Sequence, residues 1–187
     1  MRIRQPKDNL NDDDLLRLSG KGDEDAFLAL YHRHQGPVFR FALHMSGRRE
    51  IAEEVTQDVF MTLLSEPKLY AAGRGPLQGY LIGIARNKVR RQLAQSRMWT
   101  SGESIAGQGA SLFEGLNKER ELAALQSAIF SLPPNYREVI VLCDLENMDY
   151  AQIARQLGCA VGTVRSRLHR ARAILGARLR KSQGCPV

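Results

Sequence analysis

Arginine, serine and histidine side chains gather near the end of the chain, where they could donate hydrogen bonds to nucleic acid. Residues 150–187 contain eight Lys or Arg and no Asp or Glu, whereas residues 1–149 contain nineteen basic and twenty acidic residues. Nearly all of the net charge of +7 therefore comes from the last fifth of the chain. Because guanidinium groups pair with phosphates and with guanine edges, this concentration of charge indicates contact with a polyanion.

The residues that would position these donors have the pattern of a helix-turn-helix. Asp149 followed by Gln152 is typical of a capping box, and Gly158 would end the short first helix. In the next helix, at ~100° per residue, one narrow face collects the apolar residues Val164, Leu168, Ala171 and Leu175. The opposite face collects four candidate donors to bases in a major groove: Arg165, Ser166, His169 and Arg170. Three residues flank that face, where phosphates would lie: Thr163, Arg167 and Arg172. A basic, solvated helix is the alternative interpretation.

A second stretch without acidic residues runs from Pro67 to Gly102. It carries seven basic residues: Lys68, Arg74, Arg86, Lys88, Arg90, Arg91 and Arg97. We expect a loop over 73–76 and a helix over about 77–95, whose later turns would present most of these cations. A cationic helix near aromatic rings such as Tyr80 is typical of single-strand binding, although Tyr80 could equally be a core residue.

An acidic helix over about residues 50–64 precedes this loop. Its inward stripe would contain Ile51, Ala52, Val55, Val59 and Leu63. The opposite face collects polar residues around one methionine: Glu50, Glu53, Glu54, Gln57, Asp58 and Met61. A solvated acidic surface is the simpler interpretation, but the methionine in the middle of this face favours a protein-binding surface.

Apolar residues recur three and four positions apart almost throughout, which predicts an all-α protein. A Gly- and Ser-rich segment, 98–117, interrupts the pattern and is typical of a flexible linker. We therefore expect two small helical domains, 12–97 and 118–181, with tails at 1–11 and 182–187. In the first domain Asp23 or Asp25 can cap a helix that Gly36-Pro37 would perturb or Gly47 would end. In the second, Leu132-Pro133-Pro134 would stop one helix and start another.

The cysteines do not have the pattern of a metal site. Cys143, Cys159 and Cys185 are odd in number and widely spaced, which argues against a disulfide framework and against zinc. We expect no cofactor and no metal, and a nuclease or other metal-dependent enzyme has no catalytic motif to support it. No apolar run approaches ~20 residues and the start lacks a secretion-signal pattern, so we expect a cytoplasmic protein without membrane insertion.

The sequence resembles the extracytoplasmic-function (ECF) group of the sigma-70 family over most of its length. Three stretches are similar to the family's fourth conserved region: Leu132–Leu142, Asp149–Ala154 and Val161–Arg172. Five others are similar to the second region: Asp13–Leu16, Gly22–Asp23, Ala26–Phe27, Glu50–Phe60 and Tyr80–Asn87. The first and third regions of larger sigma factors have no counterpart. Gly79-Tyr80-Leu81 replaces a common Thr-Trp-Leu, and Arg90-Arg91 stands where an acidic residue is common, which bears on promoter preference.

The resemblance implies a dissociable, non-catalytic subunit that binds RNA polymerase core and directs it to promoters. The clamp coiled coil of the largest polymerase subunit would be bound by Glu53, Glu54, Gln57, Asp58 and Met61. The single strand of the minus-10 element would be held by Arg74, Tyr80, Arg86, Asn87, Lys88 and Arg90. The minus-35 duplex would be read by the four donors of the last helix, with phosphate contacts from its flanking residues.

The resemblance also implies partners. We expect promoter DNA, RNA polymerase core and an anti-sigma factor, with the chain a monomer when free or in a 1:1 complex with the anti-sigma factor. A conventional repressor or activator that uses the same helix-turn-helix is the main alternative. Such a protein would bind duplex DNA tightly without polymerase.

Overall fold

The computed structural model describes residues 7, 9–66, 70, 75–99 and 117–182 of the chain. Over these ranges the structure is helical without a strand, which confirms the all-α prediction. Nearly all of the expected linker lies outside the described residues, and so does Arg74. None of the helices in the described part of the chain combines the length and apolarity needed to cross a bilayer.

Four helices form the N-terminal domain: α1 (Asp12–Ser19), α2 (Glu24–Ser46), α3 (Arg49–Ser65) and α4 (Leu77–Trp99). Of the two predicted caps of α2, Asp23 is the one that acts, because its carboxylate accepts a hydrogen bond from the Ala26 backbone N–H (3.1 Å). The helix continues past Pro37, and Gly47 ends it in the left-handed conformation (φ 69°). The predicted inward stripe of α3 is buried as expected.

Four helices form the C-terminal domain: α5 (Asn117–Phe130), α6 (Pro134–Ile140), α7 (Tyr150–Leu157) and α8 (Val161–Ser182). The break between α5 and α6 falls at the predicted Leu132-Pro133-Pro134. The capping box of Asp149 and Gln152 is present, and Gly158 ends α7 as predicted. A π-helical segment (Val141–Leu145) continues α6 and was not predicted; its wider turn accompanies the burial of two consecutive residues, Val141 and Leu142.

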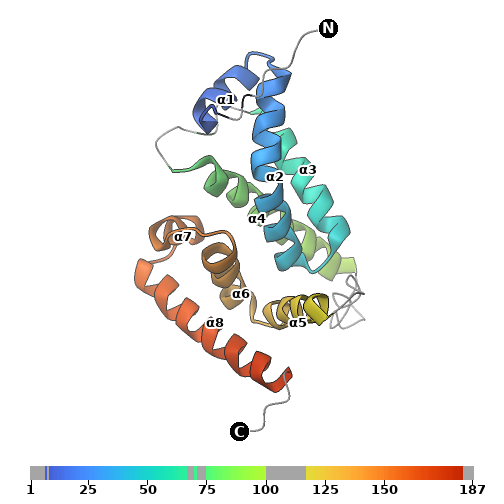
Figure 1. Ribbon diagram of the computed structural model, residues 1–187, viewed down its shortest axis with the longest axis vertical. Helices are drawn as coiled ribbons and strands as arrows, with labels where there is room; N and C mark the ends of the chain where they lie inside the picture. The colour runs from blue at the N-terminus through green and yellow to red at the C-terminus, as the bar shows by residue number, and fades with distance from the viewer. Residues whose placement is uncertain (1–6, 8, 67–69, 71–74, 100–116, 183–187) are drawn as a thin grey trace.

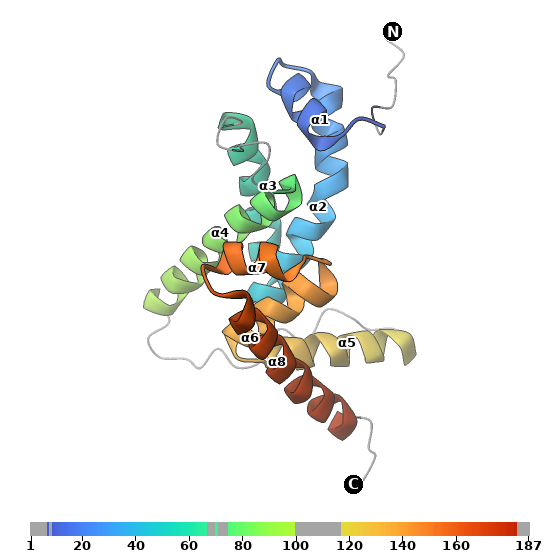
Figure 2. The same cartoon turned by 90° about the vertical axis from the view of Figure 1, so that its left-hand side faces the viewer.

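The two domains pack against each other, which the sequence did not predict. Figures 1 and 2 show α5 and α6 against α2, and α7 beside α4. At the joint, the Arg137 guanidinium lies over the Phe130 ring (4.2 Å to its centre) and donates hydrogen bonds to the backbone oxygens of Met45 (3.2 Å) and Leu132 (3.1 Å). Burial lowers the pKa of Arg137 to about 10. The end of α2 is thus tied to the C-terminal domain by a cation at its carbonyl end, where the helix dipole favours positive charge.

Candidate nucleic-acid and protein interfaces

The exposed side of α8 carries the four predicted base-reading residues, Arg165, Ser166, His169 and Arg170, which we call the reading face. All four are exposed, because the opposite stripe anchors the helix: Val164, Leu168 and Ala171 are fully buried and Leu175 is half-buried. Ser166 Oγ donates to the backbone oxygen of Thr163 (3.0 Å). Among the described residues, His169 and Arg170 have no side-chain hydrogen bond or ion pair, so their donors are available to a ligand.

The three predicted phosphate residues beside the reading face differ in their surroundings. Thr163 and Arg167 are half-buried, and Arg172 is exposed. The Arg172 guanidinium makes a bidentate ion pair with Asp144, with Nε at 3.0 Å and Nη2 at 2.6 Å from the two carboxylate oxygens. This pair raises the pKa of Arg172. A phosphate would have to share Arg172 with Asp144, whereas Arg167 has no such competitor among the described residues.

On α4 the structure describes five of the predicted strand-binding residues, Tyr80, Arg86, Asn87, Lys88 and Arg90, which we call the strand face. Asn87 and Arg90 are exposed, and Tyr80 is half-buried. The Tyr80 ring lies 5.5 Å from that of Tyr70, and burial raises the pKa of both phenols. Two neighbouring aromatic rings beside a cationic helix suit the stacking of unpaired bases.

Two cations of the strand face already have carboxylate partners. Lys88 Nζ lies 2.9 Å from a carboxylate oxygen of Asp58 on α3. Arg86 Nε lies 2.5 Å from Glu138 Oε1 on α6, in the other domain. The sequence pattern counts both residues as free positive charges. The net positive charge of this surface is therefore smaller than the sequence suggests.

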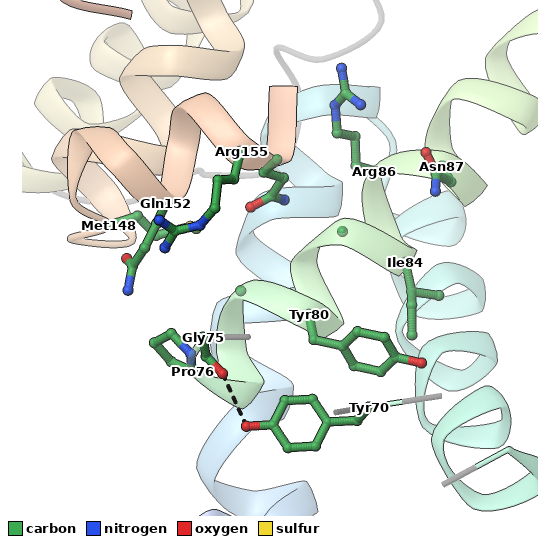
Figure 3. A pocket seen from close by; sticks show the side chains of 13 residues that line it. Tyr70, Gly75, Pro76, Tyr80, Ile84, Arg86, Asn87, Met148, Gln152 and Arg155 are labelled. Carbon is green, nitrogen blue, oxygen red and sulfur yellow. Dashed lines mark hydrogen bonds between the residues drawn. The ribbon is translucent and has the colours of Figure 1, made fainter. Parts of the chain in front are cut away.

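A cavity of about 450 Å³ separates the strand face from α7. Figure 3 shows Tyr80, Arg86 and Asn87 on the α4 side and Met148, Gln152 and Arg155 on the opposite side. Tyr70 closes one end, and its hydroxyl donates to the backbone oxygen of Gly75 (3.0 Å). The first helix of the helix-turn-helix thus lies across this cavity from the residues that we predicted to bind single-stranded DNA.

The predicted docking residues on α3 are Glu53, Glu54, Gln57, Asp58 and Met61, which we call the acidic face. Four are exposed, including Met61 at 55%, and Asp58 is half-buried beside Lys88. Glu53 also pairs with Arg49 one helical turn earlier (2.8 Å). An exposed methionine among carboxylates suits the protein-binding surface that the sequence predicts.

An apolar groove of about 710 Å³ lies beside the acidic face, between α2 and α3. Rings from both helices form it: Tyr31 lies 4.8 Å from Phe60 and Phe27 lies 6.3 Å from Phe60, both edge-on. Met61 and the exposed Leu64 lie at its rim. This groove was not predicted, although Phe27 and Tyr31 lie one helical turn apart on α2 and that spacing could have indicated it.

Among the described residues, the histidine and cysteine side chains that could bind a metal ion do not lie together. The ring of His34 is buried, and its Nε2 lies 2.9 Å from an Asp12 oxygen. Cys143 and Cys159 are half-buried free thiols, and burial raises the pKa of the Cys143 thiol. The described ranges hold no cluster of three or more His, Cys, Asp or Glu that could bind a metal ion.

Comparison with known proteins gives matches for both domains. A family model described as Sigma-70 region 2 matches residues 30–98, and one described as Sigma-70, region 4 matches residues 122–175. The ECF RNA polymerase sigma factor EcfG of Rhodopseudomonas palustris is 30% identical over 142 residues, which cover 74% of this chain and 77% of that protein. The ECF RNA polymerase sigma factor SigE of Mycolicibacterium smegmatis is 33% identical over 149 residues and 76% of this chain, but the match spans only 57% of that relative's length.

A solved structure has the same fold over most of its length. It is the sigma factor RpoE from Bartonella quintana in complex with the anti-sigma factor NepR, with a TM-score of 0.68 and 26% identity. The similarity covers 82% of this chain and 96% of that chain. Because the match extends over both domains, it concerns the two-domain architecture and not one helix-turn-helix alone.

Proposed function

The chain belongs to the ECF group of the sigma-70 family of transcription initiation factors, and on this premise we propose a role for each of its surfaces. The protein binds RNA polymerase core, recognises the minus-35 and minus-10 elements of a promoter and starts transcription there. It acts in the cytoplasm, as a specificity subunit without a catalytic site of its own. The observation that carries this proposal is that the reading face and the acidic face lie on different domains and are both exposed.

In this proposal the acidic face and the neighbouring aromatic groove bind the clamp coiled coil of the largest polymerase subunit. Carboxylates at the edge steer and orient a basic partner, while Met61 and the groove supply the apolar contact area. Glu53 and Glu54 are suitable for a test because both are exposed and, among the described residues, neither has a hydrogen bond or ion pair to the other domain. Asp58 is less suitable, since replacing it also removes the partner of Lys88 on the strand face.

The strand face binds the non-template strand of the opened minus-10 element. Tyr80 offers a ring on which a base can stack, and Asn87 and Arg90 are exposed donors for bases or phosphates. Arg74 would add a cation from the preceding loop. Arg86 and Lys88 can also contact the strand once their carboxylate partners, Glu138 and Asp58, have moved away.

The reading face enters the major groove of the minus-35 element. Arg165 and Arg170 can pair with guanine edges, and Ser166 and His169 can adapt to other bases. Thr163 and Arg167 flank the face toward the phosphates. Arg172 contributes less to salt-dependent binding than Arg167, because Asp144 already neutralises it.

The solved complex of a similar protein supports an anti-sigma factor as a further partner. An anti-sigma factor that covers the polymerase-binding surfaces would keep this chain from the core enzyme. We propose that the free chain is a monomer and that it forms a 1:1 complex with such a protein.

Core binding can be tested with a charge-reversal pair. We expect Glu53→Arg with Glu54→Arg to weaken binding to purified RNA polymerase core at least about tenfold, because like charges would face the clamp. Each single variant, Glu53→Arg and Glu54→Arg, is compared with Glu24→Arg, an exposed reversal of the same charge on the same domain but off the acidic face, which should bind normally. Equal binding by the pair and the control would refute the docking assignment, provided that circular dichroism shows all variants folded.

Promoter recognition can be tested on the promoters that the protein itself selects in cells. Mapping transcript starts after overexpression should yield two shared elements upstream of each start. On such a promoter, Arg170→Ala in the holoenzyme should cost about 1–3 kcal/mol and relax base preference, whereas Arg167→Ala should lower the salt slope by about one. A free chain that binds duplex DNA tightly yet has no affinity for core polymerase would instead identify a conventional repressor or activator.

A further inference from the structure

Arg165, the first residue of the reading face, lies against a ring from the other helix of the helix-turn-helix. Its guanidinium carbon, Cζ, lies over the ring of Tyr150, 6.0 Å from the ring centre. A cation over an aromatic face at this distance is attracted by the negative face of the ring. Among the described residues the Arg165 guanidinium has no hydrogen bond or ion pair, so this ring is the group that restricts it.

The ring of Tyr150 is itself held in place. Tyr150 is the first residue of α7 and directly follows the Asp149 cap, whose backbone N–H donates to Gln152 Oε1 (3.1 Å). Its side chain is half-buried and packs against the hydrophobic core. Gly158, in the left-handed conformation (φ 63°), then turns the chain from α7 into α8. A ring fixed by one helix therefore limits the space that an arginine of the next helix can explore.

Arg172 shows a different way of fixing an arginine on the same helix. It follows Arg165 by seven residues, so the two lie on one side of α8. The bidentate ion pair with Asp144 raises the pKa of Arg172, and the nearby Tyr150 acts in the same direction. Asp144 holds Arg172 but also occupies its donors and neutralises its charge. The ring of Tyr150 holds Arg165 and leaves every N–H donor of that guanidinium free for a ligand.

This difference matters because an arginine reads guanine with two parallel N–H donors. The pairing needs one orientation of the guanidinium plane, and a free arginine loses much rotamer freedom when it adopts it. Contact with the ring removes part of that freedom before DNA binds. Arg165 is also the fifth residue of α8, within the N-terminal turns that contact base edges in helix-turn-helix proteins.

We propose that Tyr150 is a positioning residue for promoter reading, whose ring orients the Arg165 guanidinium for the base that this arginine contacts. The inference rests on the proposed function, because it takes α8 to be the helix that reads the minus-35 element. Tyr150 acts through Arg165 and needs no base contact of its own. Loss of the ring should therefore weaken the preference at one base pair and leave the others as they are.

The test measures the base preference of the holoenzyme within the minus-35 element. A promoter found by mapping transcript starts is varied base by base over that element, and the binding of each version by holoenzyme made with purified core is compared. We expect Tyr150→Leu to lower the preference about two- to fivefold, as for a cation–π contact at an exposed site. The loss should occur only at the base pair whose preference Arg165→Ala relaxes. Tyr150→Phe keeps the ring and should keep the parent's preference.

Tyr136→Leu is the matched control for this substitution. Tyr136 is also half-buried against the hydrophobic core of the C-terminal domain, but among the described residues no cation lies over its ring. It should retain the parent's preference at every position. Circular dichroism checks that the variants are folded. If Tyr150→Leu does not fold, Tyr150→Met serves in its place, because a flexible methionine fills the space without a ring.

Three results would overturn the inference, and they separate it from the function on which it rests. An unchanged preference in folded Tyr150→Leu or Tyr150→Met would refute the positioning role. An equal loss with Arg165 present and with Arg165→Ala would show that Tyr150 acts through packing, so the positioning role fails while α8 still reads the element. If Arg165→Ala changes the preference at no minus-35 position, Arg165 reads no base, and the proposed function itself fails at that residue.

Discussion

Replacing Gly47 by alanine should strain the joint between the two domains by a calculable amount. Gly47 has a φ of 69°, and a Cβ at this position would lie 2.6 Å from Cζ of Phe130. The left-handed backbone alone costs a residue with a Cβ about 1–2 kcal/mol. The overlap adds about 1–3 kcal/mol, because the Arg137 guanidinium lies on the Phe130 ring at 4.2 Å and restricts its escape. We therefore expect the free energy of unfolding to fall by about 2–5 kcal/mol.

Gly22 provides a matched control for the backbone contribution. Its φ is 87°, but a Cβ there would meet nothing within 4 Å. Gly22→Ala should therefore cost only the conformational part, about 1–2 kcal/mol. Both variants can be compared by urea-induced unfolding followed by circular dichroism, with equal slopes required for the comparison.

A double-mutant cycle then isolates the overlap. Phe130→Ala removes the ring, so Gly47→Ala should cost about 1–3 kcal/mol less in that background than in the parent. If Gly47→Ala and Gly22→Ala lower the free energy of unfolding equally and the cycle shows no coupling, Phe130 does not lie against Gly47 in solution. The packing of the two domains described above would then be wrong.

Three further predictions concern single domains. Leu168→Ala should cost about 2–5 kcal/mol in thermal unfolding and weaken duplex binding, because this fully buried residue anchors α8; a loss under about 1 kcal/mol would show that the anchor is misassigned. Asp149→Ala should cost about 1 kcal/mol and reduce amide protection in α7, since it removes the acceptor of the Gln152 backbone N–H (2.7 Å); unchanged hydrogen exchange would contradict the cap. Burial lowers the pKa of His34 below 6.5 despite the nearby Asp12, so the unfolded state binds the proton more readily than the folded state. The free energy of unfolding should therefore fall as the pH drops below about 6.5. Urea midpoints at two pH values should show this fall, and His34→Gln should reduce it.

Local patterns predicted the parts of the fold that short-range physics determines. The capping box of Asp149 and Gln152, and the helix end at Gly158, depend on residues within a few positions of each other. The phase of α8 was also predictable, because a helix that packs on one side must place Val164 and Leu168 together. The reading face followed directly from that phase. By contrast, the π-helical segment Val141–Leu145 depends on how the core accommodates it, and no local sequence signal announced it.

The partners of the cations were not predictable in this way. Lys88 pairs with a residue thirty positions away, Arg86 with one fifty-two away and Arg40 with one 106 away. The amphipathic pattern of α4 shows that Arg86 can face outward but not what it faces. A charge count therefore treats every arginine on α4 alike, although Arg90 is exposed and Arg86 is neutralised by the other domain.

The acidic residues between the two basic stretches carried a signal that the charge count did not use. Glu138 and Glu146 lie in a short apolar segment, and both are buried in the structure. A buried carboxylate requires a cation, and the segment around these residues offers few, so their partners had to come from another part of the chain. For Glu138 on α6 that partner is Arg86 on α4. In the structure Glu138 neutralises Arg86, so the positive potential of α4 is lower than its sequence alone suggests.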